Sequence, residues 1–231
     1  MFALLLLGTG ADALALDPSL QPTQYVLDNW QIPDGLPQST SQALARTPDG
    51  YLWIGTQEGL ARFDGIRFTV FDTGNEAAIP NKHISVLHVD RAGRLWIGTR
   101  SGIAVLAAGR FETLPLRGLA HAYIRAITEG KSGQLWVGTE TGLVELIDGK
   151  ATRFFDVSNG LNDGRIRALT PGRDGALWIG TMSGLQRFDG QRFEGVPLDR
   201  AQTLEAVTAL HEDPDGALWV GTGIGELYRR V

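Results

Sequence analysis

The residues of this chain that could bind a small molecule are polar side chains at two positions that recur before a turn glycine. Eight residues before each of five such glycines stand Gln42, Ser85, Arg125, Arg167 and Thr208, and ten residues before them stand Thr40, His83, Tyr123, Arg165 and Ala206. An arginine guanidinium binds a carboxylate or sulfate through forked hydrogen bonds, and a tyrosine ring stacks on a sugar or an apolar ring. The pattern predicts one ligand site composed of Gln42, His83, Ser85, Tyr123, Arg125, Arg165 and Arg167. The alternative is that these arginines pair with acids of neighbouring repeats or lie in solvent.

Catalytic and metal sites leave residue patterns that this sequence does not contain. Its four histidines are His83, His88, His121 and His211. His88 and His211 occupy the same position in two distant repeats, whereas a metal ion requires ligands that converge. The Asp-x-Asp-Gly of residues 213–216 lacks the rest of a calcium loop, and neither a Gly-Lys-Ser/Thr phosphate loop nor a Gly-x-Ser-x-Gly nucleophile motif is present. We therefore predict no catalytic residue, no metal and no cofactor.

The charge and cysteine content exclude further classes of function. The 231 residues include 21 Lys and Arg against 26 Asp and Glu, which gives a formal net charge of -5. Such a chain lacks the basic footprint that binds a nucleic-acid backbone, so we expect no nucleic-acid partner. Cysteine is absent, which excludes disulfides, a thiolate nucleophile and cysteine metal ligands.

The elements that must position the candidate site belong to an internal repeat. The sequence Leu-Trp-(Ile/Val)-Gly-Thr occurs five times, and its tryptophans, which stand 43, 40, 42 and 41 residues apart, are Trp53, Trp96, Trp136, Trp178 and Trp219. A period near 40 residues is typical of a repeat architecture in which each unit is one supersecondary structure. The number of such units therefore determines the fold.

One repeat reads as four short strands. In the fourth repeat, the apolar or alternating runs 166–170, 176–181, 185–188 and 192–197 are separated by turns that contain glycine, a pattern typical of an antiparallel meander. A helical repeat would need longer runs with a period of 3.6 residues. A single four-stranded sheet cannot bury both faces, but sheets arranged radially pack on their neighbours as the blades of a β-propeller. We predict an all-β propeller of five four-stranded antiparallel blades, with each tryptophan wedged between blades.

The two ends of the repeat region complement each other. Asp34-Gly35-Leu36 matches Asn159-Gly160-Leu161 in spacing, because each glycine precedes a repeat tryptophan by 18 residues. This alignment predicts that residues 25–31, which include Trp30, form an isolated fourth strand, while residues 207–231 supply only three strands. We expect the N-terminal strand to complete the last blade and close the ring. The alternative is that the chain is a fragment of a larger propeller.

The first residues resemble a secretory signal. Residues 2–8 form an apolar run and Ala13-Leu14-Ala15 has the small-x-small cleavage pattern, although no Lys or Arg precedes the run. We predict a signal peptide over residues 1–15 and a propeller sensor domain over residues 16–231, located in the periplasm. The run is too short to span a bilayer, and a plain N-terminal tail is the alternative.

The repeat resembles a known family. Residues 50–56, Gly-Tyr-Leu-Trp-Ile-Gly-Thr, and residues 59–65, Gly-Leu-Ala-Arg-Phe-Asp-Gly, are similar to the two-component regulator propeller repeat. The resemblance implies a periplasmic, ligand-sensing module of a hybrid histidine kinase or diguanylate cyclase receptor, with an oligosaccharide or other small molecule as ligand and a homodimer as the signalling form. The sequence departs from the two seven-bladed propellers of that family in having five repeats, and it contains neither the membrane helix nor the output domain.

Two other classes of function stay open from the sequence alone. A propeller lyase or hydrolase would need His83, His121 or a pair of carboxylates at the axial mouth. A protein-interaction scaffold would need neither a ligand site nor catalysis. We favour the sensor and predict that the chain is not itself an enzyme.

Overall fold

The computed structural model describes residues 21, 23, 27–115, 121–198 and 205–231 of the chain. The chain divides into two units, Met1–Trp30 and Gln31–Val231. The strands all belong to the second unit, and the predicted signal peptide lies outside the described residues. None of the helices among those residues is long and apolar enough to span a membrane.

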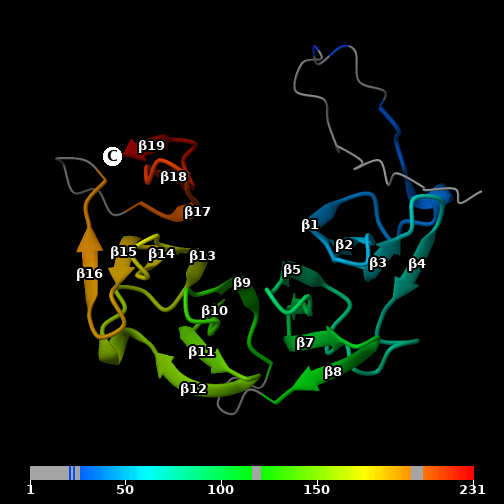
Figure 1. The fold of residues 1–231 in the computed structure, drawn as a ribbon, viewed down its shortest axis with the longest axis horizontal. Coiled ribbons are helices and arrows are strands. Elements are labelled where there is room, and N and C mark those ends of the chain that lie inside the picture. Colours follow the sequence, from blue (N-terminus) through cyan, green and yellow to red (C-terminus); the bar gives the residue numbers. More distant parts are fainter. Residues whose placement is uncertain (1–20, 22, 24–26, 116–120, 199–204) are drawn as a thin grey trace, which may run out of the picture. The chain divides into compact units, whose positions relative to one another are not determined.

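Nineteen strands among the described residues form five antiparallel sheets (Figure 1). The first sheet contains β1 (Ser41–Arg46), β2 (Leu52–Thr56), β3 (Leu60–Phe63) and β4 (Phe68–Phe71), and the second contains β5 (Ile84–Val89), β6 (Leu95–Thr99), β7 (Gly102–Ala107) and β8 (Arg110–Leu114). The third contains β9 (Ile124–Glu129), β10 (Leu135–Thr139), β11 (Leu143–Ile147) and β12 (Lys150–Phe155), and the fourth contains β13 (Ile166–Pro171), β14 (Leu177–Thr181), β15 (Gly184–Phe188) and β16 (Phe193–Val196). The fifth contains β17 (Val207–Glu212), β18 (Leu218–Thr222) and β19 (Leu227–Arg230). Two short 3-10 helices, η2 (Ile32–Asp34) and η3 (Val157–Asn159), precede β1 and β13.

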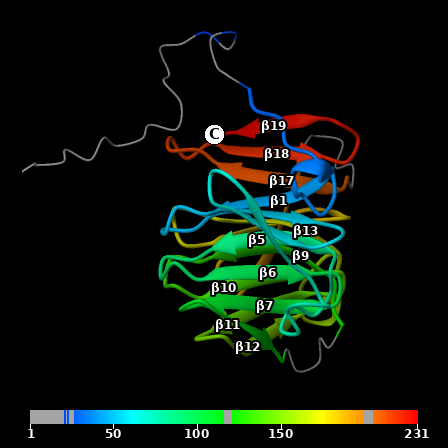
Figure 2. The ribbon, with the colours of Figure 1, turned by 90° about the vertical axis from the view of Figure 1, so that its right-hand side faces the viewer.

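Each sheet is a blade whose strands follow chain order, as Figure 2 shows for β5, β6 and β7. The first strands of the blades are neighbours in the order β1, β5, β9, β13 and β17, and they line the centre of this unit (Figure 1). The predicted all-β propeller with five blades is therefore confirmed.

The predicted completion of the last blade is not what the structure shows. The fifth sheet has three strands, β17–β18–β19, and Leu27–Gln31 contains no strand among the described residues. Strand β1 packs beside β5 and forms no comparable contact with β17. The predicted strand depends only on the distance in sequence from Trp30 and Gly35 to the first repeat tryptophan. In the structure, Gly35 at this distance is the C-cap of η2, with φ 108°.

The repeated tryptophans occupy the predicted place between blades. Trp53 packs with Ile84, Leu87 and Leu95 of the second blade, and Trp136 packs with Ile166, Leu177 and Phe188 of the fourth. Trp53, Trp96 and Trp136 are 3% exposed or less. An arginine lies over each repeated indole, at 5.2–6.0 Å from the guanidinium carbon to the ring centroid, and these arginines are Arg62, Arg94, Arg153, Arg187 and Arg229.

Candidate functional site

The candidate site lies where the first strands of three adjacent blades begin. His83 and Tyr123 immediately precede β5 and β9, and Arg125 and Arg167 are the second residues of β9 and β13. Antiparallel pairing brings the turn after each second strand to the same end, as shown by the hydrogen bond from the Arg100 N–H to the His83 carbonyl. Residues that precede the first strands and residues that follow the second strands therefore lie together at this end.

Two arginines from neighbouring blades share one carboxylate. Arg125 Nε donates to Glu140 Oε1 at 2.5 Å, and Arg167 Nη1 donates to the same oxygen at 3.1 Å. The side chains of Arg125, Arg167 and Glu140 keep 30%, 23% and 28% exposure. A partly exposed guanidinium has more donors than one oxygen can accept, so this ion-pair group retains donors that a second anion can use.

An aromatic pair extends the group toward the second blade. The guanidinium carbon of Arg125 lies 3.7 Å from the centroid of the Tyr123 ring, and that of Arg100 lies 5.7 Å away. Tyr123 Oη and His83 Nε2 are 3.3 Å apart. Burial, together with the charges of Arg100 and Arg125, lowers the pKa of His83. His83 is therefore neutral at pH 7, and the positive charge at this end comes from the arginines. We call the six residues His83, Arg100, Tyr123, Arg125, Glu140 and Arg167 the arginine cluster.

The other predicted site residues are not members of this cluster. Arg165 pairs with Asp163 through Nη2 and Oδ2 at 2.6 Å and keeps 53% exposure. The Ser85 hydroxyl donates to the carbonyls of Gly98 and Ile124 at 3.0 and 2.6 Å, so it connects the second and third blades. Gln42 is exposed on β1, which does not contact the third or fourth blade to an extent comparable with β5. The prediction thus identified four of the six residues that the structure brings together.

Sequence reasoning missed Arg100 and Glu140, although a signal was present. Both residues directly follow the Gly-Thr pair of their repeats, where the equivalent residues are Gln57, Met182 and Gly223. The repeat pattern does not mark this position, because its residue type differs in every repeat. The alternative interpretation of the arginines was partly right, since Arg125, Arg165 and Arg167 all pair with acids.

The remaining histidines do not form a site. His88 on β5 is opposite Trp96 in the sheet register, and burial lowers its pKa. His211 lies on β17, in the fifth blade, and His121 has φ 69° in the turn before β9. Within the described part of the chain, no group of three or more His, Asp or Glu side chains is placed to hold a metal ion.

The repeat pattern and the fold together identify the family. The model of the two component regulator propeller family matches residues 35–58, 78–101, 118–141, 160–183 and 203–223, about half of the chain. Each matched segment covers a first strand, a second strand and the tryptophan between blades. The chain belongs to the two component regulator propeller family.

Solved structures share the fold at low sequence identity. The extracellular domain assigned to the hybrid two component system BT3049 from B. thetaiotaomicron has a TM-score of 0.69 and 21% identity over 79% of this chain and 26% of that chain. The corresponding domain of BT4673 from the same organism has a TM-score of 0.70 and 22% identity, with 82% and 26% coverage. Virginiamycin B lyase from Staphylococcus aureus has a TM-score of 0.62 and 19% identity, with 82% and 69% coverage.

These solved structures share the propeller architecture of this chain. This chain spans about a quarter of the length of the two extracellular domains that it resembles. No curated protein sequence matches it significantly. Identities this low show a shared fold and nothing about the chemistry of the arginine cluster.

Proposed function

We propose that this propeller is the ligand-sensing module of an exported signalling receptor, and that its ligand is a small acidic molecule bound by the arginine cluster. The observation that carries the proposal is the convergence of Arg125 and Arg167, from adjacent blades, on one oxygen of Glu140. A carboxylate or sulfate of the ligand would accept hydrogen bonds from the same two guanidinium groups. A site that spans two blades also couples ligand binding to the blade-to-blade geometry.

An acidic oligosaccharide is the ligand class that this site fits best. Arg125 and Arg167 supply charge-assisted donors, and the His83–Tyr123 pair beside them supplies a ring and two polar atoms for hydroxyl groups. Arg100, Arg125 and Arg167 outnumber the single carboxylate of Glu140, so the cluster is cationic in a chain of net charge -5. This local excess of positive charge selects anions over neutral sugars.

The signalling role rests on the family. The model of the two component regulator propeller family matches all five repeats. Extracellular domains assigned to hybrid two component systems share the fold. We propose a periplasmic location, a dimeric receptor, and an output by a histidine kinase or a diguanylate cyclase that the ligand controls by rearranging the propeller dimer. The chain itself then binds and does not catalyse.

The binding site is tested by calorimetric titration of the purified chain with digalacturonate and, separately, with inorganic sulfate. Arg125→Ala and Arg167→Ala should each weaken binding by about tenfold or more, because each removes a charge-assisted contact. Arg187→Ala is the matched control, since Arg187 pairs with Asp174 outside the cluster. Equal affinities in the wild type and both cluster variants would refute this site.

One observation favours a second function. The neutral His83 within reach of the Tyr123 hydroxyl is a pair that can accept a proton, and a lyase shares this fold. Under that function, incubation with a polyuronate should release unsaturated products that absorb in the ultraviolet, and His83→Ala should abolish them. Binding of digalacturonate without release of product would exclude this second function and leave the ligand-binding one.

A further inference from the structure

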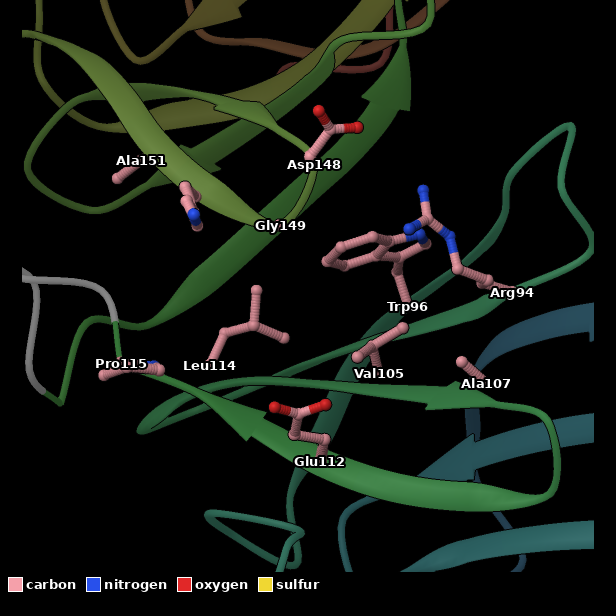
Figure 3. A pocket seen from close by; sticks show the side chains of 11 residues that line it. Arg94, Trp96, Val105, Ala107, Glu112, Leu114, Pro115, Asp148, Gly149 and Ala151 are labelled. Carbon is pink, nitrogen blue, oxygen red and sulfur yellow. The ribbon is translucent and has the colours of Figure 1, made fainter.

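A pocket of about 490 Å³ lies between the second and third blades (Figure 3), and no residue of the arginine cluster lines it. Its floor is formed by Trp96, Val105 and Leu114 of the second blade, and its other wall by Asp148, Gly149 and Ala151 of the third. Arg94, Glu112 and Lys150 also line it. Figure 3 shows the carboxylates of Glu112 and Asp148 on opposite sides of the apolar floor.

The equivalent groove between the first and second blades contains a smaller pocket of about 410 Å³, which Trp53, Arg62 and Phe111 help to line. The registers of the two blades match Arg62 to Val105, since each lies opposite the repeat tryptophan. They also match Phe71 to Leu114, each opposite the first apolar residue of the third strand. Phe111 of the second blade matches Ala151 of the third. Phe111 lies edge-on to Trp53, and Arg62 lies over that indole.

The groove between the third and fourth blades contains a phenyl ring at the same register position. Phe155 lies beside Trp136, and Phe193, the equivalent of Ala151, lies against Phe155 with a centroid distance of 5.2 Å. Arg153 covers Trp136, with its guanidinium carbon 5.6 Å from the indole centroid. Both flanking grooves therefore contain a phenyl ring from the following blade and a guanidinium over the indole.

The pocket over Trp96 lacks the phenyl ring, because Ala151 stands at that position. It keeps a guanidinium over the indole. Arg94, in the turn between β5 and β6, lies with its guanidinium carbon 5.2 Å from the ring centroid, and its Nε donates to Asp90 Oδ2 at 2.6 Å. The side chains of Glu112, Asp148 and Lys150 form no hydrogen bond or ion pair with another described residue. Asp90 pairs with the guanidinium of Arg94, so the two carboxylates of Glu112 and Asp148 are opposed only by the ammonium of Lys150. This excess of negative charge around an apolar recess favours a cation.

We infer that this pocket binds a small aromatic amine, whose ring takes the place of the missing phenyl group and whose ammonium is bound by Glu112 and Asp148. The ring contacts Val105, Leu114 and Ala151, which are apolar and line one recess. A phenyl ring fits, because the neighbouring grooves enclose Phe111 and Phe193 at the same register position. The site is separate from the arginine cluster, which binds anions, so it would give the propeller a second ligand of opposite charge.

The test is calorimetric titration of the full chain with phenethylamine, with 3-phenylpropionate as the anion of similar shape. We expect saturable binding of phenethylamine and affinity at least about tenfold lower for 3-phenylpropionate. Ala151→Phe supplies the residue that the neighbouring blades contain, and it should abolish phenethylamine binding while its thermal unfolding midpoint stays at or above that of the wild type. Asp148→Asn should weaken binding of the amine and leave binding of the anion unchanged.

Thr69→Phe is the matched control, because Thr69 lies on the fourth strand of the first blade, is exposed and does not line this pocket. It should bind phenethylamine as the wild type does. Three results would overturn the inference: no binding to the wild type, unchanged binding to a folded Ala151→Phe variant, or equal affinity for the amine and the anion.

Discussion

A methyl group placed on Gly138 would lie 2.4 Å from Cγ2 of Ile166, the first residue of the next blade's first strand. The same relationship joins Gly55 to Ile84, Gly98 to Ile124 and Gly180 to Val207, each at 2.7 Å. None of these four glycines has a positive φ. The glycine of the Leu-Trp-x-Gly-Thr repeat has no side chain, and this leaves the space that a β-branched side chain of the next blade occupies.

Gly138→Ala should destabilise the propeller by about 1–3 kcal/mol, the usual cost of overpacking a close contact. Gly221 offers a matched comparison, because a methyl group there would meet only Ala209 of its own blade, at 3.3 Å. Gly221→Ala should cost less than about 1 kcal/mol, because the half-buried site brings the added methyl group against Ala209 alone. Denaturant unfolding of both variants measures this difference. Equal losses would show that another element packs on Gly221 and that the ring closes.

Arg153 supports a buried carboxylate as well as an indole. Its Nε and Nη2 donate to the two oxygens of Glu145, each at 2.8 Å, and its Nη1 donates to the Gly190 carbonyl at 2.9 Å. Hydrogen bonds from Arg153 lower the pKa of Glu145, although burial opposes them. Arg153→Ala should cost about 2–3 kcal/mol, less than breaking a fully buried pair, because Arg153 is itself 42% exposed.

The double variant Arg153→Ala with Glu145→Gln separates the two contributions to this loss. The neutral amide removes the unpaired buried charge, so the double variant should recover about half of the lost free energy. Denaturant unfolding of the two variants side by side checks this. A single variant as stable as the wild type would contradict the account of Glu145.

The ionisation of Asp163 makes the free energy of unfolding depend on pH in the acid range. Hydrogen bonds from Arg165 and Ser183 lower the pKa of Asp163 from 3.8 to about 2. A carboxyl whose pKa is lower in the folded state binds its proton more readily when the chain unfolds. Its contribution is therefore complete above pH 3.8 and is lost as the pH falls toward about 2.

Asp163→Asn should lower the free energy of unfolding at neutral pH by about 1–2 kcal/mol, after allowance for the exposed Arg165. The difference between the variant and the wild type should shrink as the pH falls from 4 toward about 2. Unfolding measured at several pH values in that interval tests the sign. A difference that is constant with pH would mean that the Asp163–Arg165 pair contributes no pH-dependent stability.

The sequence predicted the blades better than their side-chain chemistry. The five tryptophans and the turn glycines determine the strands, and through antiparallel pairing they also place His83, Tyr123, Arg125 and Arg167 at one end. Glu140 was not predictable from the repeat, because the position after Gly-Thr contains a different residue type in every repeat. The role of Ser85 was also hidden, since its hydroxyl bonds to the carbonyl of Ile124 in the next blade. Contacts between blades depend on packing that a single-repeat pattern does not contain.

The pocket over Trp96 has a signal in the sequence that the site prediction did not use. Ala151 stands 15 residues after its repeat tryptophan, where the other complete repeats have Phe68, Phe111 and Phe193. The strand registers place these four residues at equivalent positions. The consequence of the smaller side chain, a pocket between two blades, is visible only in the structure.

Arg125 and Arg167 are available to an acidic ligand that competes with Glu140 for their hydrogen bonds. The most direct test is calorimetric titration of digalacturonate into the wild type and into Glu140→Gln. We expect Glu140→Gln to bind more tightly by about fivefold to tenfold, because the amide no longer competes as an anion for the two guanidinium groups. Weaker binding by Glu140→Gln, or no binding by either protein, would contradict a ligand site at these arginines.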